Sequence, residues 1–227
     1  MNLTKEQLEQ IRGFIQQKGF NYIDVQMEIL DHVASSVEEK MEADQHLKFE
    51  DAVVETHQSF GIMGFNTIAD GITNSIKAKY SRLFWQNFIS AFGYKYVLLL
   101  CFLIFSIYKI QEILTATNYY LFLVLGMLIV YGTMIFSTIQ VSRYKKYVSF
   151  KSGISFLSLL GSVLLFANLA VEGTPSNFTI FSIHVQSLIV LFSIVLFVLF
   201  FYAAIKTAKT SIRETKLLKE KYKLLYS

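Results

Sequence analysis

The stretch SLIVLFSIVLFVLFFYAAI, Ser187 to Ile205, decides the fold class of this chain. Its 19 residues contain no charged residue, no proline and no glycine. At 1.5 Å rise per residue, a helix of this length extends about 29 Å, close to the roughly 30 Å hydrocarbon core of a bilayer. The stretch is therefore predicted to be a membrane-spanning helix.

Three more long apolar segments precede it, with only short connections between them. A buried core helix is the alternative interpretation of each segment, but a water-soluble chain of 227 residues could not cover all four. The start of the first span is left open, because Phe84 to Phe92 is also apolar and Lys95 can snorkel from the interface. The predicted transmembrane helices are residues 96–114, 119–141, 150–171 and 183–205.

Positive charges lie on one side of the predicted spans. Lys and Arg stay preferentially in the cytoplasm when loops are short. The connections around 115–118 and 172–182 contain neither residue type. Basic residues gather before the first span, between the second and third spans, and after the fourth, among them Lys77, Lys79, Arg82, Arg143, Lys145, Lys146, Lys151, Arg213 and Lys216. The chain is therefore predicted to be a multi-pass protein with both termini in the cytoplasm.

The formal net charge of +4 conceals a strong asymmetry. Residues 1–70 carry 13 acidic and 5 basic residues, a net charge of −8, and the rest of the chain carries +12. A basic collar at the cytoplasmic leaflet attracts anionic lipid, at about 1 kcal/mol per charge near the surface. Anionic lipid is therefore a predicted partner, and the basic pI of the whole chain does not indicate direct nucleic-acid binding.

Residues 1–65 are predicted to form a small acidic cytosolic head of three to four helices. Thr4 with Gln7 three residues later forms a capping-box pattern, which predicts a helix over 5–18. Two further helices are predicted, from about Asn21 to Ala43 and over 49–60. Each carries apolar residues at helical spacing, so the three can share one core.

The second helix of the head has a predicted acidic face. At 100° per residue, Asp24, Glu28 and Asp31 lie opposite the apolar side. We predict that these three residues, together with Glu38, are exposed and bind a protein partner. His32, four residues after Glu28, falls on the border between the faces. We interpret it as a structural residue that fixes the packing of the helix, in preference to a metal ligand.

Residues 66–95 and 207–227 flank the predicted membrane region. In residues 66–95, Lys77, Lys79 and Arg82 come just before Trp85, a combination typical of the membrane interface. Residues 207–227 are predicted to form a basic amphipathic helix that continues from the last span. It contacts anionic lipid through residues such as Arg213 and Lys216, or else the acidic head docks on it or on the loop at residues 143–151.

The head resembles the HAAS domain, a short helical module at the N-terminus of many bacterial membrane proteins. The resemblance rests on Glu28-Ile29-Leu30-Asp31-His32-Val33, on Glu38, Glu39 and Met41, on Phe49-Glu50-Asp51-Ala52 and on Phe60-Gly61. Lys48-Phe49 stands where the family usually has a capping Ser or Thr, and the match covers about a quarter of the chain. The resemblance implies a bacterial inner-membrane protein with a cytosolic sensing or docking module, in a family often encoded beside PadR-like transcription regulators. It implies no catalytic residues.

Motifs for catalysis are absent from the sequence. There is no HExxH, no GxSxG and no phosphate-binding loop, and the single cysteine, Cys101, cannot form an intramolecular disulfide. Polar residues that interrupt the spans include Ser158, Ser162 and Asn168, and Gly161 with its serine neighbours could allow a close helix contact. No catalytic residue, cofactor or metal site is predicted.

The predicted fold is all-α: a cytosolic helical head, a four-helix transmembrane bundle and a basic C-terminal helix. The favoured function is a non-enzymatic signalling or scaffold protein of a bacterial inner membrane, whose head recruits an unknown protein partner such as a PadR-like regulator or a membrane complex. Two alternatives are a small transporter or lipid-handling protein regulated by the head, and an accessory subunit of a larger complex. A homodimer is left open.

Overall fold

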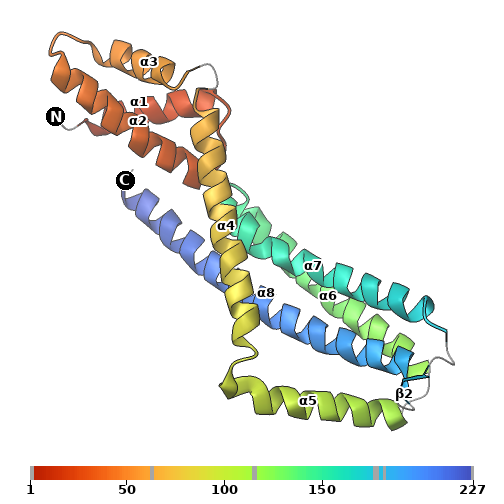
Figure 1. Ribbon diagram of the computed structural model, residues 1–227. Helices are drawn as coiled ribbons and strands as arrows, with labels where there is room; N and C mark the ends of the chain where they lie inside the picture. The colour runs from red at the N-terminus through yellow and green to blue at the C-terminus, as the bar shows by residue number, and fades with distance from the viewer. Residues whose placement is uncertain (1–2, 62–63, 114–116, 176–178, 181–182, 226–227) are drawn as a thin grey trace. The chain divides into compact units, whose positions relative to one another are not determined.

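The structure is a computed structural model that describes residues 3–61, 64–113, 117–175, 179–180 and 183–225 (Figure 1). Almost all of the described chain is helical, which confirms the all-α class. The only described strands are a two-residue antiparallel pair, β1 (Thr179–Ile180) and β2 (Ile183–His184). The helices are α1 (Lys5–Gln17), α2 (Ile23–Ala43), α3 (Phe49–Ser59), α4 (Asn66–Ser90), α5 (Tyr94–Ile113), α6 (Thr117–Tyr144), α7 (Val148–Glu172) and α8 (Val185–Leu225).

The chain divides into two compact units. The N-terminal unit comprises Met1–Lys79 together with two distant segments, Tyr144–Lys151 and Arg213–Ser227. The apolar unit comprises Tyr80–Arg143 and Ser152–Ile212. Helices α4, α7 and α8 each contribute residues to both units.

The first helix begins as its sequence predicts. The Thr4 side chain accepts a hydrogen bond from the Gln7 backbone N–H at 3.3 Å, and the Gln7 side chain accepts one from the Thr4 N–H at 2.9 Å. This capping box satisfies two of the N–H groups that a helix start leaves without partners. Gly19 then follows α1 with φ +94°, a left-handed conformation that glycine adopts without strain.

The N-terminal unit has its own hydrophobic core. Helix α2 packs against both α1 and α3. Their inward faces follow the 3.6-residue period of the sequence, so the apolar stripes meet in one cluster. Phe65, before α4, and Val148, at the start of α7, complete it. Its main buried residues are Ile11, Ile15, Val25, Ile29, Leu30, Val33, Val37, Ala52 and Val53.

His57 on α3 packs against this core. Its ring lies edge-on to Phe65 with 4.8 Å between centroids, and to Phe14 with 5.3 Å. Burial lowers the pKa of His57 below the ordinary 6.5, and the positive charge of Lys18 lowers it further. His57 is thus held as a neutral aromatic residue in the packing of the head.

Acidification should therefore weaken the N-terminal unit. The stabilisation from neutral His57 is fully present above pH 6.5, and it is lost as the pH falls below 6.5 toward the lower folded-state pKa. Over this range the unfolded chain takes up a proton that the folded chain does not. Amide hydrogen exchange of α1 and α3 in the full chain should accelerate between pH 7 and pH 5.5, after correction for the intrinsic exchange rate. His57→Phe, which keeps an aromatic ring, should remove this pH dependence; an unchanged dependence would assign the effect to other groups.

Two helices of the described chain are long and apolar enough to cross a membrane. They are α7, with mean hydropathy 2.1 over its most apolar window, and α8 from Val185 to Tyr222, with 3.0. Within α6 only Val124–Thr133 forms a shorter apolar segment among the described residues. Membrane association therefore has support from length and composition, and the number of spans stays a prediction.

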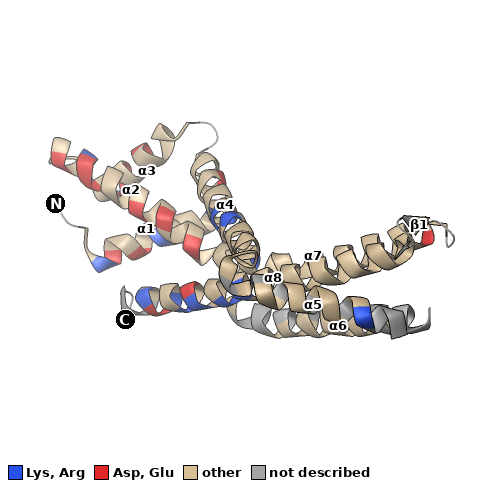
Figure 2. Cartoon of the chain, turned by 60° about the horizontal axis from the view of Figure 1, so that its bottom comes forward, with Lys and Arg blue, Asp and Glu red and all other residues tan. Residues whose placement is uncertain are grey.

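Helix α8 continues without a break from the apolar stretch into the basic tail, as predicted (Figure 1). Its 41 residues extend about 60 Å at 1.5 Å per residue, about twice the thickness of a hydrocarbon core. Charged residues begin at Lys206 and are frequent from there to the end of the helix (Figure 2). One helix therefore carries both a candidate span and the charged tail.

In the apolar unit, helices α4, α7 and α8 meet around an aromatic cluster and a line of small residues. The Phe84 ring of α4 stacks on Phe156 of α7 with 4.4 Å between centroids and lies 5.3 Å from Phe200 of α8. The Asn87 side chain donates to the Thr207 hydroxyl at 3.1 Å, and both residues are buried. Small side chains on α8 permit this close approach, namely Ala203, Ala204, Thr207, Ala208 and Ser211, all buried.

Candidate functional site

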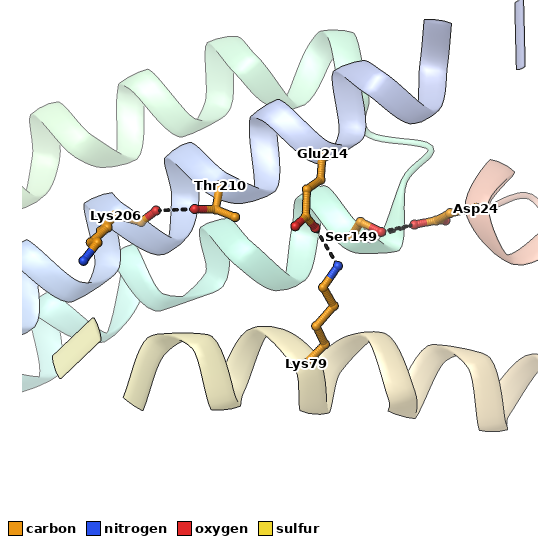
Figure 3. Close-up of polar contacts among 6 residues, drawn as sticks. All are labelled: Asp24, Lys79, Ser149, Lys206, Thr210 and Glu214. Carbon is orange, nitrogen blue, oxygen red and sulfur yellow. Dashed lines mark hydrogen bonds and ion pairs between the residues drawn. The ribbon is translucent and has the colours of Figure 1, made fainter. Parts of the chain in front are cut away.

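The most elaborate polar site lies inside the N-terminal unit, where Asp24 of α2 meets the start of α7 (Figure 3). One carboxylate oxygen accepts a hydrogen bond from the Val148 N–H at 3.0 Å. The other accepts from the Ser149 N–H and the Ser149 hydroxyl, each at 2.8 Å. Asp24 is 4% exposed. It therefore acts as the N-terminal cap of a helix that begins 124 residues later in the sequence.

The physical reason for this contact is the unsatisfied start of α7. The first backbone N–H groups of a helix have no partner within the helix, and they lie at the positive end of its dipole. A buried carboxylate supplies both the acceptors and the opposite charge. Hydrogen bonds to a charged group contribute about 1.5–3 kcal/mol each, and this set satisfies Asp24 in place of water.

The start of α2 is fixed by the same loop. Tyr22, the residue before α2, makes no side-chain capping bond, and the Ile23 N–H instead donates to the Lys146 carbonyl at 2.8 Å. Thus the loop before α7 accepts a bond from the first turn of α2, and Asp24 in that turn accepts bonds from α7. The first N–H groups of α2 and of α7 therefore each find an acceptor in the segment that begins the other helix.

Apolar contacts accompany these hydrogen bonds. Val148 is 5% exposed and belongs to the core of the head. Tyr147 is also buried, and its pKa is raised by that burial and by the negative charge of Asp24. The loop before α7 is therefore part of the hydrophobic core that α1 to α3 form in the N-terminal unit.

Two further polar contacts join distant segments of the N-terminal unit. The Lys151 ammonium donates to the Tyr22 hydroxyl at 2.8 Å and lies 4.8 Å from the centroid of its ring. The Lys79 ammonium forms an ion pair with Glu214 at 2.7 Å (Figure 3). Both lysines are exposed, so each pair contributes little to stability, about 1 kcal/mol or less.

These contacts correct the predicted acidic face. Asp24 is buried and committed to α7, so it is not an exposed partner-binding residue. Glu38 is half-buried and accepts a hydrogen bond from the Leu3 N–H at 2.9 Å, so it fixes the N-terminal segment of its own chain. Glu28 and Asp31 are exposed, as predicted. The acidic surface of α2 that is free to solvent is thus smaller than the periodicity indicated.

The prediction for His32 also needs correction. The side chain is exposed, and no polar or aromatic contact of it is found in the part of the chain that the structure describes. His32 follows the exposed Asp31 on the helix and shares its solvent-facing side. The histidine that packs in the head is His57. In the sequence, its only signal is that of a single histidine in an amphipathic helix.

The predicted interface residues lie mostly at exposed positions. Arg143 falls outside the residues whose side chains are described. Trp85 is 49% exposed and contacts Phe84 and Phe88, so it lies at the edge of the aromatic cluster. The other predicted interface residues are exposed, namely Lys77, Lys79, Arg82, Lys145, Lys146, Arg213 and Lys216.

The apolar unit contains a groove of about 590 Å³ between α7 and α8. Its lining is almost wholly apolar, with Phe166, Phe192 and Phe200 among the larger side chains, and Ser162 and Ser193 as its polar residues. Ser158 and Asn168, which also interrupt the predicted spans, are not part of this lining. Ser158 donates to the Ser155 carbonyl instead, and Asn168 donates to Glu172.

The arrangement at Asp24 is one of helix capping and hydrophobic packing within the chain. Among the residues that the structure describes, no group of three His, Cys, Asp or Glu side chains could hold a metal ion. No protein-family model, no curated protein and no solved structure matches the chain.

Proposed function

We propose that this chain is a non-enzymatic protein of a bacterial inner membrane with a signalling or scaffold role. Its HAAS-like head recruits a protein partner on the cytoplasmic side, for which a PadR-like regulator and a membrane complex are the candidates. The lengths and hydropathies of α7 and α8 support the membrane location. The packing of α1, α2 and α3 around one core supports a folded head.

We extend this proposal to four transmembrane helices with both termini in the cytoplasm. Large apolar side chains on α5 and α6 are strongly exposed, for example Leu98 at 82%, Phe102 at 70% and Leu128 at 63%. Exposed apolar side chains in such numbers are unfavourable in water and favourable in lipid. The basic residues beside the spans support the orientation.

One observation carries the proposed role: α2 holds both a solvent-exposed acidic pair and the buried cap of α7. Glu28 and Asp31 are exposed, while Asp24, one turn before Glu28, accepts three hydrogen bonds from the first turn of α7. Helix α7 is itself a candidate span. A partner that binds Glu28 and Asp31 would therefore contact the same helix, α2, whose Asp24 caps the start of α7. Partner binding at α2 would in this way be coupled to the start of a candidate membrane span.

Charge reversal on α2 tests partner recruitment. The double variant Glu28→Lys with Asp31→Lys should lose a partner that co-purifies with the full chain after gentle solubilisation, because an acidic contact surface becomes basic. The matched control is Glu50→Lys with Asp51→Lys, an equal charge change at exposed positions of α3. Quantitative mass spectrometry should show at least a tenfold loss in the first variant and retention in the control. Retention in both variants, or equal loss in both, would contradict the assignment of the α2 face.

A further inference from the structure

A second cavity lies wholly within the N-terminal unit, beside the Asp24 site. Its volume is about 600 Å³. Three segments distant in sequence line it: residues 19–25 before and within α2, residues 69–73 of α4, and residues of the loop and first turn of α7 between 145 and 151. Phe20, Val25 and Ala69 provide apolar surface. The cavity therefore exists only where the head and the loop before α7 are packed together.

The charged groups of this cavity are mainly cationic. Lys145, Lys146 and Lys151 line it, against one carboxylate, that of Asp70. Lys151 is held by the Tyr22 hydroxyl and ring. Lys145 and Lys146 are exposed, and within the described residues neither forms an ion pair. The tyrosine hydroxyl and the Asn21 and Thr73 side chains add neutral hydrogen-bonding groups.

We propose that this cavity binds the phosphate-bearing headgroup of an anionic phospholipid. A phosphate diester needs positive charge and hydrogen-bond donors, and the lysines with Asn21 and Thr73 supply both. The glycerol and the first part of the acyl chains need apolar surface, which Phe20 and Val25 supply. The proposal rests on the proposed membrane location of the chain.

The position of the lysines favours a lipid over a free phosphate. Lys145 and Lys146 directly precede α7, and Lys151 lies in its first turn. Because α7 is a candidate span, these residues fall where the headgroup layer meets a helix that enters the bilayer. A free phosphate would gain nothing from the apolar part of the cavity, whereas a lipid uses both parts.

Lipid binding would also stabilise the packing of the head against the loop before α7. The cavity walls come from the head, from α4 and from the α7 loop, so a ligand that fills it binds only the packed arrangement. A ligand that binds one arrangement shifts the equilibrium toward it in proportion to its concentration over its Kd. The Ile23 N–H, which donates to the Lys146 carbonyl, lies at this junction and reports on it.

The test uses the full chain purified in a neutral detergent, with short-chain phosphatidylglycerol as the probe and native mass spectrometry to count bound lipid. The double variant Lys145→Gln with Lys146→Gln should bind at least tenfold more weakly, since each cation near an anionic surface contributes about fivefold in affinity. The control, Lys5→Gln with Lys48→Gln, removes the same charge from exposed positions of the head outside the cavity lining. It should change affinity less than twofold.

Two further comparisons decide the source of the phosphate and the site. Short-chain phosphatidylcholine should bind at least tenfold more weakly than phosphatidylglycerol, and glycerol phosphate should compete poorly with it. Equal losses in the two double variants, or equal binding of the two lipids, would overturn the site. Competition by glycerol phosphate as strong as that by lipid would overturn the lipid assignment in favour of a soluble phosphate compound.

Hydrogen exchange of the unmodified chain keeps the test independent of the folding of any variant. Phosphatidylglycerol should slow exchange of the Ile23, Val148 and Ser149 amides, while phosphatidylcholine should not. Unchanged exchange at all three amides with phosphatidylglycerol in excess would show that lipid binding does not stabilise the packing of the head against the loop before α7. Flotation with vesicles separates this inference from the proposed function: a chain that fails to insert overturns the membrane location, and insertion without phosphatidylglycerol selectivity overturns only the lipid site.

Discussion

Replacing Gly153 with alanine is expected to destabilise the apolar unit by about 3 kcal/mol, the upper end of the usual cost of an extra methyl group in a packed core. A Cβ at position 153 would overlap the Cβ and Oγ atoms of Ser211, far inside van der Waals contact. Both residues are buried where α7 and α8 cross, so the added atom has no space to move into. The backbones would have to separate, and the contacts along the line of small residues on α8 would be lost.

Fluorescence of Trp85, the only tryptophan, can follow this unfolding in mixed micelles, because its ring contacts Phe84 and Phe200 in the aromatic cluster. Gly161→Ala on the same helix is the control. Its added Cβ would meet the nearest Val130 methyl at 3.8 Å, an ordinary contact, so stability should change by less than about 0.5 kcal/mol.

A second substitution separates a steric cause from any other. Ser211→Gly removes the Cβ and Oγ atoms that the new methyl group strikes, and the Ser211 Cα lies at 3.6 Å, which is ordinary contact distance. The double variant should therefore recover most of the stability lost by Gly153→Ala. If Gly153→Ala alone melts like the unmodified chain, the close crossing of α7 and α8 is wrong.

The next largest effect is expected for Asp24→Ala, which should release the start of α7 from the head at a cost of about 3 kcal/mol. The substitution leaves the Val148 and Ser149 N–H groups without their acceptor in a buried site, and it removes the charge that opposes the helix dipole. Asp24→Asn keeps the shape and one acceptor oxygen, so its cost should be about half as large.

Hydrogen exchange at Val148 and Ser149 measures this release directly. Roughly a hundredfold faster exchange corresponds to the expected cost for Asp24→Ala. Asp31→Asn, at an exposed position of the same helix, is the control and should leave both amides protected. Protected amides in Asp24→Ala would mean that the apolar contacts of Val148 hold the segment without the carboxylate.

Local patterns predicted the helices of the head closely. The expected ranges 5–18 and 49–60 correspond to α1 (Lys5–Gln17) and α3 (Phe49–Ser59), because capping residues and apolar periodicity act within a few residues of each other. The continuity of α8 followed from the same logic, since the tail keeps helical spacing after Ile205 and contains no proline or glycine.

The same local patterns could not predict contacts between residues that are far apart in the sequence. Helical periodicity placed Asp24 with Glu28 and Asp31, but it could not show that a helix start 124 residues later would cover that one carboxylate. Likewise the sequence pattern predicted a close helix contact at Gly161, whereas Gly153 is the glycine at which a neighbouring helix leaves no room for a side chain. Both outcomes depend on which surfaces meet.

The amino-acid sequence by itself determined the helical class, the apolar segments long enough for a bilayer and the opposite charges of the head and the rest of the chain. These properties follow from composition and spacing along one segment at a time. Only the tertiary structure decided that the loop before α7 completes the core of the head, that Asp24 is a cap, and that three lysines share a cavity with Tyr22. The reason is that burial and capping depend on neighbours from segments that are distant in the sequence. No local pattern indicates which distant segment will pack against a given residue.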